Sequence, residues 1–195
     1  MLRHIFIVVL IFALTACGRS PKTNFYMLNS EISSDGHFQQ DSRGVGIGVW
    51  KVQLPILLDR YEIVTRTGLY NIELADFHQW AGGLVNNMTE LIASDLGRRL
   101  QTDRVVISPW SSYRKHDYQV KIHVRRFDGV LGGETELSGA WSLLNGQGSK
   151  EIVRESFNFK TRTQGDQYSD MVAALSQLTV MLSEQIAGVI AAQDN

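Results

Sequence analysis

The feature that most constrains the fold is a strict alternation of apolar and polar residues beyond the middle of the chain. Apolar side chains at every second position alternate without interruption with polar ones at Tyr118, Gln119, Val120, Lys121, Ile122, His123, Val124 and Arg125. This period of two is typical of a half-buried β-strand. The alternation recurs at 137–143 and 153–159, and turn residues lie between the segments at 132–133 and 145–148. The three segments therefore predict an antiparallel meander with one buried face.

Two segments instead show the period of an amphipathic helix. Apolar residues recur three and four positions apart from Phe77 to Leu100 and again from Tyr168 to Val189. Asp76 followed by Gln79 has the spacing of a weak capping box, so we expect the first helix to begin there. Asn87 and Asp95 fall on the side of this helix that we expect to face water.

Shorter β-like segments complete the expected architecture. They lie at 45–54, which ends before Pro55, at 62–66 and 69–74 on either side of Thr67-Gly68, at 104–108, and as an edge strand at 25–28. We therefore expect an α/β fold: a mixed sheet of about seven strands with an antiparallel C-terminal meander, packed by two long amphipathic helices. The long helix allows a parallel crossover. The pattern leaves open whether the helices cover one face of the sheet or both.

The N-terminus has the features of a bacterial lipoprotein signal. A basic start at Arg3 precedes the apolar run Ile5 to Leu14, which is shorter than the about 20 residues that span a bilayer. Leu14-Thr15-Ala16-Cys17 follows, and Cys17 is the only cysteine. We expect cleavage after residue 16 and a diacylglycerol and an N-acyl chain on Cys17, which anchor the chain to a membrane. An uncleaved anchor and an ordinary secretory signal with an incidental cysteine are the alternatives.

The expected mature chain comprises a lipidated tether at 17–44 and a single α/β domain at 45–195. Gly18 follows the acylated residue, where an aspartate would favour retention in the inner membrane of a Gram-negative cell, so we expect export to the outer membrane. Cleavage leaves 18 basic against 20 acidic residues. This slightly negative balance gives no indication of nucleic-acid binding, and without a second cysteine the chain forms no internal disulfide.

Motifs for catalysis, metals or cofactors are weak throughout the sequence. The glycines at 44–48 precede a strand-like rather than a helical segment, which argues against a phosphate loop. The five histidines lack metal-ligand spacing, and we expect His78 and His123 to face solvent. We therefore expect no enzyme activity, metal or cofactor. Trp80 and Trp141 are in phase with apolar neighbours and are expected in the core, whereas Trp50 and Trp110 are candidates for a surface contact.

One segment resembles a known family. Leu54-Pro55-Ile56-Leu57-Leu58-Asp59-Arg60-Tyr61-Glu62-Ile63-Val64-Thr65-Arg66 is similar to a motif of the ABC-type transport auxiliary lipoproteins, the PqiC-like family. The segments 25–28, 75–80, 106–110, 118–128 and 140–143 match this family in kind and order. Leu57, Tyr61 and Glu62 depart from the motif, in which Tyr, Pro and Gln are usual.

The resemblance implies a non-enzymatic lipoprotein on the periplasmic face of the outer membrane. It also implies that the protein binds an MCE-domain protein of a lipid-transport system and forms a homo-oligomer. The candidate partner or oligomer interface is formed by Leu54, Pro55, Leu58, Asp59, Arg60, Val64 and Arg66. Alternatively, Pro55 and an ion pair from Asp59 to Arg60 or Arg66 shape a turn. The rival function is that of a structural or assembly lipoprotein that supports outer-membrane protein or lipopolysaccharide assembly or contacts the cell wall.

Overall fold

The computed structural model describes residues 21–30, 44–111 and 115–193. The predicted signal peptide at 1–16, Cys17, Gly18 and most of the tether therefore lie outside the described residues. The elements follow one another in the order β1 (Asn24–Tyr26), β2 (Ile47–Val49), β3 (Glu62–Arg66), β4 (Ile72–Trp80), α2 (Leu84–Arg99), β5 (Val105–Ile107), β6 (Tyr118–Gly129), β7 (Glu134–Asn145), β8 (Glu151–Arg162) and α3 (Tyr168–Gln193).

The predicted antiparallel meander forms the body of a five-stranded sheet with the strand order β5-β2-β6-β7-β8. Val120 aligns with Leu143 and Leu143 with Val153, which sets the register across all three long strands. Val120, Ile122 and Val124 are buried, and the polar residues between them are exposed. The alternation of the sequence thus corresponds to one face packed on the core and one face in water.

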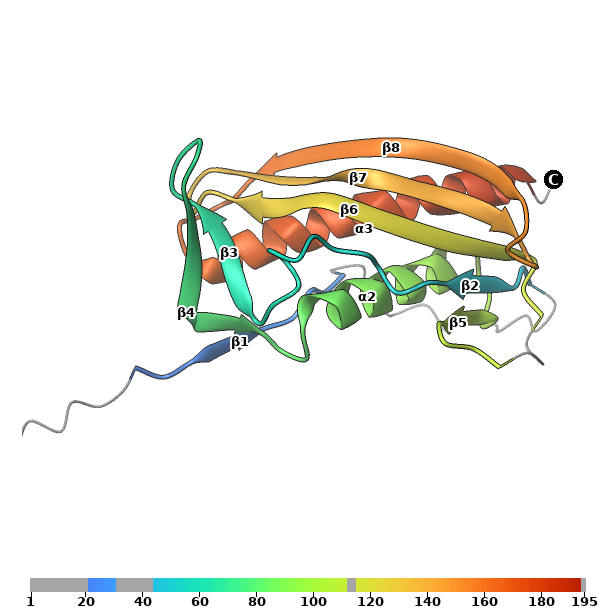
Figure 1. Cartoon of the computed structure of the whole chain (residues 1–195), viewed down its shortest axis with the longest axis horizontal. Helices are drawn as coiled ribbons and strands as arrows, with labels where there is room; N and C mark the ends of the chain where they lie inside the picture. Colours follow the sequence, from blue (N-terminus) through green and yellow to red (C-terminus); the bar gives the residue numbers. More distant parts are fainter. Residues whose placement is uncertain (1–20, 31–43, 112–114, 194–195) are drawn as a thin grey trace, which may run out of the picture.

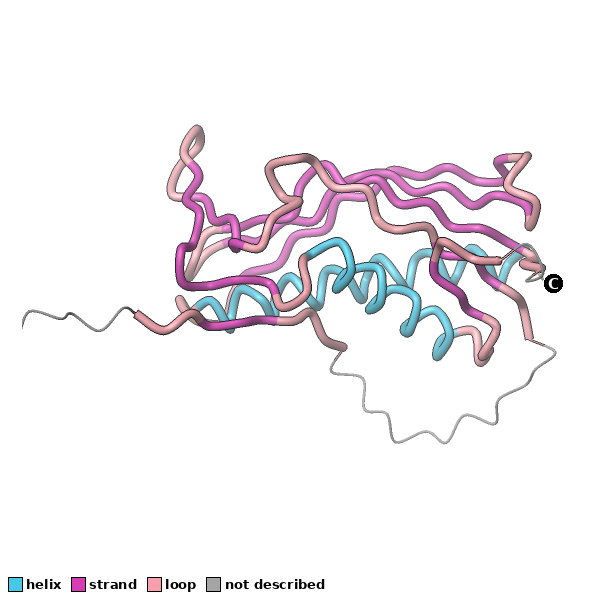
Figure 2. The backbone as a smooth tube through the Cα atoms, turned by 60° about the horizontal axis from the view of Figure 1, so that its bottom comes forward, coloured by secondary structure: helices cyan, strands magenta, loops and turns pink. Residues whose placement is uncertain are grey.

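Both helices cover the same face of this sheet, which settles the alternative left open by the sequence pattern (Figures 1 and 2). The longer helix, α3, contacts β6, β7 and β8, and α2 lies between α3 and β5. By length and apolarity α3 could span a membrane, but 56% of its most apolar window is buried inside the protein. Its apolar side chains, among them Leu178 and Leu182, form the core with Trp141, so α3 is the central helix of this fold.

The parallel part of the five-stranded sheet lies beyond β6, at the edge opposite β8. β2 pairs in parallel with β5 on one edge and with β6 on the other, as expected for a mixed sheet. The predicted strand at 45–54 is shorter, with a single further bridge at Gln53. A Cβ at Gly48 would lie 3.1 Å from atoms of both His116 and Trp110. The glycine therefore permits close packing and belongs to a strand rather than to a phosphate loop.

The fold contains a second, three-stranded sheet that we did not expect, with the order β1-β4-β3. Residues 76–80, where the sequence pattern predicts the start of the first helix, form the end of β4, and α2 starts only at Leu84. The predicted cap at Asp76 and Gln79 is therefore wrong. Gly82 and Gly83 have φ angles of 74° and 84°, and this left-handed backbone, which glycine adopts easily, separates the strand from the helix.

The polar side of α2 is also more buried than expected. Asn87 and Asp95 were predicted to face water, but both are buried. The Asn87 Nδ2 donates to the carbonyl of Gly83 over 2.9 Å. Asp95 accepts hydrogen bonds from Arg98 and Arg99, at 2.7 and 2.8 Å. Because α3 packs beside α2, this side of the helix is covered by protein, and Asp95 and the amide nitrogen of Asn87 form hydrogen bonds with groups in or just before α2.

Candidate functional site

The segment singled out by its motif begins as a tight turn between β2 and β3. The carbonyl of Pro55 accepts hydrogen bonds from the backbone N–H groups of Leu58 and Asp59, at 2.8 and 3.1 Å. Leu58 points into the core, whereas Ile56 is 91% exposed. The turn is thus held from inside by one leucine and presents its remaining apolar side chains to solvent.

The predicted interface residues divide into two groups. Leu58 and Val64 are buried in the core cluster, and Leu54 packs against it, so these three stabilise the fold rather than offering a free surface. Asp59 is exposed, and Arg60 is half-buried. The exposed apolar residues of this segment are instead Ile56, Leu57 and Tyr61, which the motif analysis did not select as contacts.

Arg66 has a structural partner, but it is not Asp59. Its Nε donates to Oδ1 of Asp128 over 2.9 Å, and the Asp128 side chain is only 3% exposed. The pair joins β3 of the small sheet to the end of β6 in the large one. The alternative interpretation of the motif, an ion pair from Asp59 to Arg66 that shapes a turn, is therefore wrong for Arg66, because its ion pair with Asp128 links two sheets.

The same carboxylate starts a chain of charges across the meander. Arg126 Nε also donates to Asp128 Oδ1, at 2.8 Å, and its Nη1 reaches Glu136 at 2.6 Å. Desolvation lowers the pKa of Arg126, but hydrogen bonding to Asp128 and the charges of Asp128 and Glu136 outweigh it and raise the pKa. Lys160 of β8 lies 3.6 Å from Glu136, and its hydrogen bond to Glu134 of β7 lowers the pKa of Glu134. The chain of alternating charges therefore spans β3, β6, β7 and β8.

The two surface tryptophans lie together, at a distance from the motif. The rings of Trp50 and Trp110 meet edge to face with centroids 4.9 Å apart. Trp50 Nε1 donates to Gln119, and Lys121 lies 5.0 Å from the ring centroid of Trp50. The backbone of Trp50 binds that of Val120. Val120 and Asp128, the partner of Arg66, are eight residues apart on β6. At about 3.3 Å per residue, this separation is roughly 26 Å. Trp50 and Trp110 thus form a separate cluster.

An aromatic stack that the sequence analysis missed holds the first strand in place. His78, predicted to face solvent, is half-buried and stacks on Tyr168 with ring centroids 3.8 Å apart. The hydroxyl oxygen of Tyr26 forms a hydrogen bond of 2.7 Å with Nδ1 of His78. Burial raises the pKa of Tyr26 and of Tyr168. The stack joins β1, β4 and the start of α3, and only the helical phase of Tyr168 indicated any part of it. Trp80 and Trp141 are in the core, as predicted.

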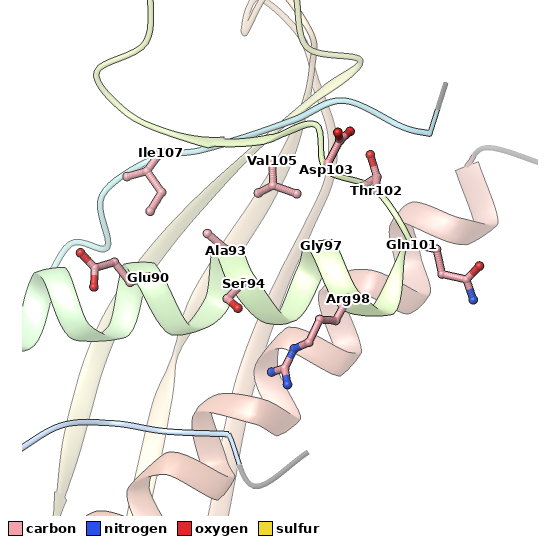
Figure 3. A pocket seen from close by; sticks show the side chains of 10 residues that line it. All are labelled: Glu90, Ala93, Ser94, Gly97, Arg98, Gln101, Thr102, Asp103, Val105 and Ile107. Carbon is pink, nitrogen blue, oxygen red and sulfur yellow. The ribbon is translucent and has the colours of Figure 1, made fainter. Parts of the chain in front are cut away.

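A shallow groove lies between α2 and the edge strand β5 (Figure 3). It has a volume of about 470 Å³ and is lined by Ala93, Gly97, Val105 and Ile107, with Glu90, Arg98 and Asp103 among the polar residues around it. None of the residues predicted from the motif line this groove. Within residues 21–30, 44–111 and 115–193, no group of three or more His, Cys, Asp or Glu side chains has the geometry of a metal site.

Comparison with solved structures shows the same fold in other proteins. An uncharacterised protein is 23% identical, with a TM-score of 0.69, and the match covers 87% of this chain and 99% of the other. A DUF330 protein of Xanthomonas campestris, XCC0632, is 14% identical, with a TM-score of 0.71 and coverage of 88% and 98%. Among curated proteins, none matches the sequence.

The family model for the ABC-type transport auxiliary lipoprotein component matches residues 26–187, which include the last residue of β1, all strands from β2 to β8, α2 and most of α3. The match therefore covers the turn at 55–58 as well as both residues of the Arg66–Asp128 pair, and it agrees with the resemblance of the segment from Leu54 to Arg66. The chain belongs to the ABC-type transport auxiliary lipoprotein family.

Proposed function

We propose that this protein is a non-enzymatic, lipid-anchored subunit that docks an MCE-type lipid-transport system at the periplasmic face of the outer membrane. One observation carries the proposal: an acylation motif ending at Cys17 stands directly before a domain of the transport-auxiliary family. In this proposal the diacylglycerol and N-acyl chain on Cys17 hold the protein in the membrane. Gly18 permits its export to the outer membrane, and the folded domain binds the MCE-domain protein.

The turn at 55–61 is the proposed contact with the MCE-domain protein. Ile56 is almost fully exposed, and Tyr61 is 62% exposed on the same short segment. The anchored Leu58 and the hydrogen bonds to Pro55 fix the turn before a partner arrives, so little conformational entropy is lost on binding. Tyrosine is among the residues that most often dominate binding energies, and Ile56 adds apolar surface that a partner can bury.

The contact is tested by capture of the partner from detergent-solubilised envelopes with the full, acylated chain. We expect Ile56→Asp to weaken capture of the MCE-domain protein by about tenfold or more, a change of ~1.4 kcal/mol. Met181→Asp is the matched control, because Met181 is an exposed apolar residue on α3, outside this turn. Undiminished capture by the Ile56 variant would exclude the turn. Capture of outer-membrane assembly proteins in place of an MCE-domain protein would favour the rival function.

The anchor and the oligomeric state are tested separately. We expect the intact mass of the membrane-extracted protein to equal that of the chain from Cys17 onward plus its acyl chains, and Cys17→Ser to leave the membrane fraction. A bare thiol in the mature protein would refute the anchor. We also propose that the protein is a homo-oligomer, which light scattering of the detergent-solubilised protein measures directly as a mass of several protomers.

A further inference from the structure

The end of the molecule that carries β1 exposes an unusual number of large apolar side chains. Phe25 on β1 is 66% exposed, and Met27, just after β1, is 60% exposed. Leu69 and Tyr70, in the connection between β3 and β4, are 80% and 90% exposed. Phe77 is 40% exposed on β4. We call these five residues the apolar end patch. Hairpin tips in water are normally polar, and large apolar side chains exposed together at one end of a domain indicate an interaction.

The patch occupies the outer side of the small sheet. Phe25 aligns with Gln79 in the β1–β4 ladder, and Phe77 lies two residues before Gln79, so Phe25 and Phe77 share a face. The neighbouring positions Tyr26 and His78 point the other way, toward Tyr168 of α3. A sheet with one solvated face should carry polar residues on it, yet here Phe25 and Phe77 lie exposed on that face beside Gln79.

The position of the proposed acylated residue indicates what this face meets. Seven peptide units separate Cys17 from the start of β1, which limits the distance between them to about 25 Å at full extension. The tether reaches β1 at the end where α3 begins, since Tyr26 contacts Tyr168. The other end of α3 is roughly 39 Å away for 26 residues. The patch is therefore at the end of the molecule held close to the lipids.

Figure 1 shows the same arrangement in space. The β3–β4 hairpin and β1 form one end of the molecule, the described chain begins beside them, and the β7–β8 turn lies at the opposite end. Charges near the patch are mixed, with Lys22 exposed before β1 and Glu73 and Asp76 exposed on β4. Because these charges have both signs, they would not attract this end of the molecule strongly to a charged surface. Contact with another surface must therefore depend on burial of the apolar side chains.

From these observations we propose that the apolar end patch rests in the headgroup region of the lipid bilayer to which the chain is anchored, so that the small sheet sets the orientation of the domain on the membrane. Leu69 and Tyr70 at the hairpin tip enter deepest, since tyrosine and leucine suit the boundary between headgroups and acyl chains. This inference rests on the lipid anchor proposed above. It commits to lipid as the occupant, with a second copy of the chain and another protein as the alternatives to be tested.

The test uses spin labels on the acylated full chain in nanodiscs of phosphatidylethanolamine and phosphatidylglycerol. Because acylation would consume the only native cysteine, Leu69→Cys and Phe77→Cys each give one labelled site. Gln147→Cys in the exposed β7–β8 turn is the matched control at the far end. We expect the ratio of collisions with dissolved oxygen to collisions with a water-soluble nickel chelate to be several-fold higher at positions 69 and 77 than at 147. The mixed charges predict that this difference persists at high salt.

Each other outcome overturns the inference in a distinguishable way. Labels at 69 and 77 that are as accessible to the nickel chelate as the label at 147 would show that the patch faces water. Line broadening that disappears on dilution with unlabelled chains would show that a second copy covers it. Protection from both reagents without such broadening would show that these side chains pack against protein rather than lipid. A bare Cys17 in the intact mass would instead refute the anchor, and the inference with it.

Discussion

The buried carboxylate of Asp128 should contribute strongly to stability, and replacing it with asparagine tests this. Asp128 is almost fully buried and accepts hydrogen bonds from both Arg66 and Arg126. Asparagine keeps the size of the side chain but removes the charge, which leaves two guanidinium groups beside each other. Losing one member of a fully buried pair costs about 3–5 kcal/mol. The two arginine side chains are 27% and 35% exposed and regain some hydration, so we expect a loss of about 2–3 kcal/mol.

Thermal unfolding of the detergent-solubilised protein, followed by circular dichroism, measures this loss. At about 2–4 °C per kcal/mol for a chain of this size, Asp128→Asn should lower Tm by about 5–10 °C. Arg66→Met should lower it less, and the double variant should lose less than the sum of the two, because both remove the same interaction. Lys160→Met, which breaks a surface pair with Glu134, is the control and should leave Tm nearly unchanged. An unchanged Tm for Asp128→Asn, or strict additivity of the two losses, would refute the assignment.

Three further predictions concern close packing, helix propensity and pH. Gly139→Ala should destabilise the meander by several kcal/mol or prevent folding, because the new Cβ would lie 2.3 Å from the carbonyl oxygen of His123; a Tm close to that of the wild-type protein would contradict this. Gly188→Ala meets nothing within 4 Å inside α3 and should stabilise the protein by about 0.5–1 kcal/mol, detectable as a higher Tm. Burial raises the pKa of both Tyr26 and Tyr168, so the folded chain keeps protons that the unfolded chain releases near pH 10. The free energy of unfolding should therefore be unaffected by these two groups below pH 10 and should decrease as the pH rises above 10. Absorbance of tyrosinate at 295 nm should show a late-titrating component that disappears in the double Phe variant, and its persistence there would refute the assignment.

The sequence predicted best those elements whose burial follows a local period. β6, β7, β8 and α3 were recognised because one face of each packs on the core, and the side-chain pattern records this directly. The helix prediction was wrong at residues 76–80, where Phe77, Trp80, Ala81 and Leu84 happen to have helical spacing. Tertiary pairing with β1 and β3 outweighs that spacing and holds the segment extended.

The candidate site was harder to predict because its geometry depends on distant partners. Arg66 and Asp128 are 62 residues apart in the chain, and both belong to segments that match the family, yet no periodicity connects them. The motif therefore located important residues without distinguishing those that pack from those that are exposed. Leu58 and Ile56 are both apolar and differ only in which side of a turn they occupy. That distinction requires the fold.

Two of the interactions that join the small sheet to the rest of the protein help to explain how an anchor at one end could position a partner site. Arg66 and Asp128 connect β3 to the large sheet, and the stack of Tyr26, His78 and Tyr168 connects β1 and β4 to α3. The strand next to the proposed tether is thus fixed to the same body that carries the turn at 55–61. A domain attached only by a flexible tether would present Ile56 in every direction. With β1 packed on the body and the apolar end patch in contact with lipid, the turn would instead be held at a defined angle to the membrane. A partner approaching from across the periplasm would then meet it in one orientation, and less entropy would be lost on binding.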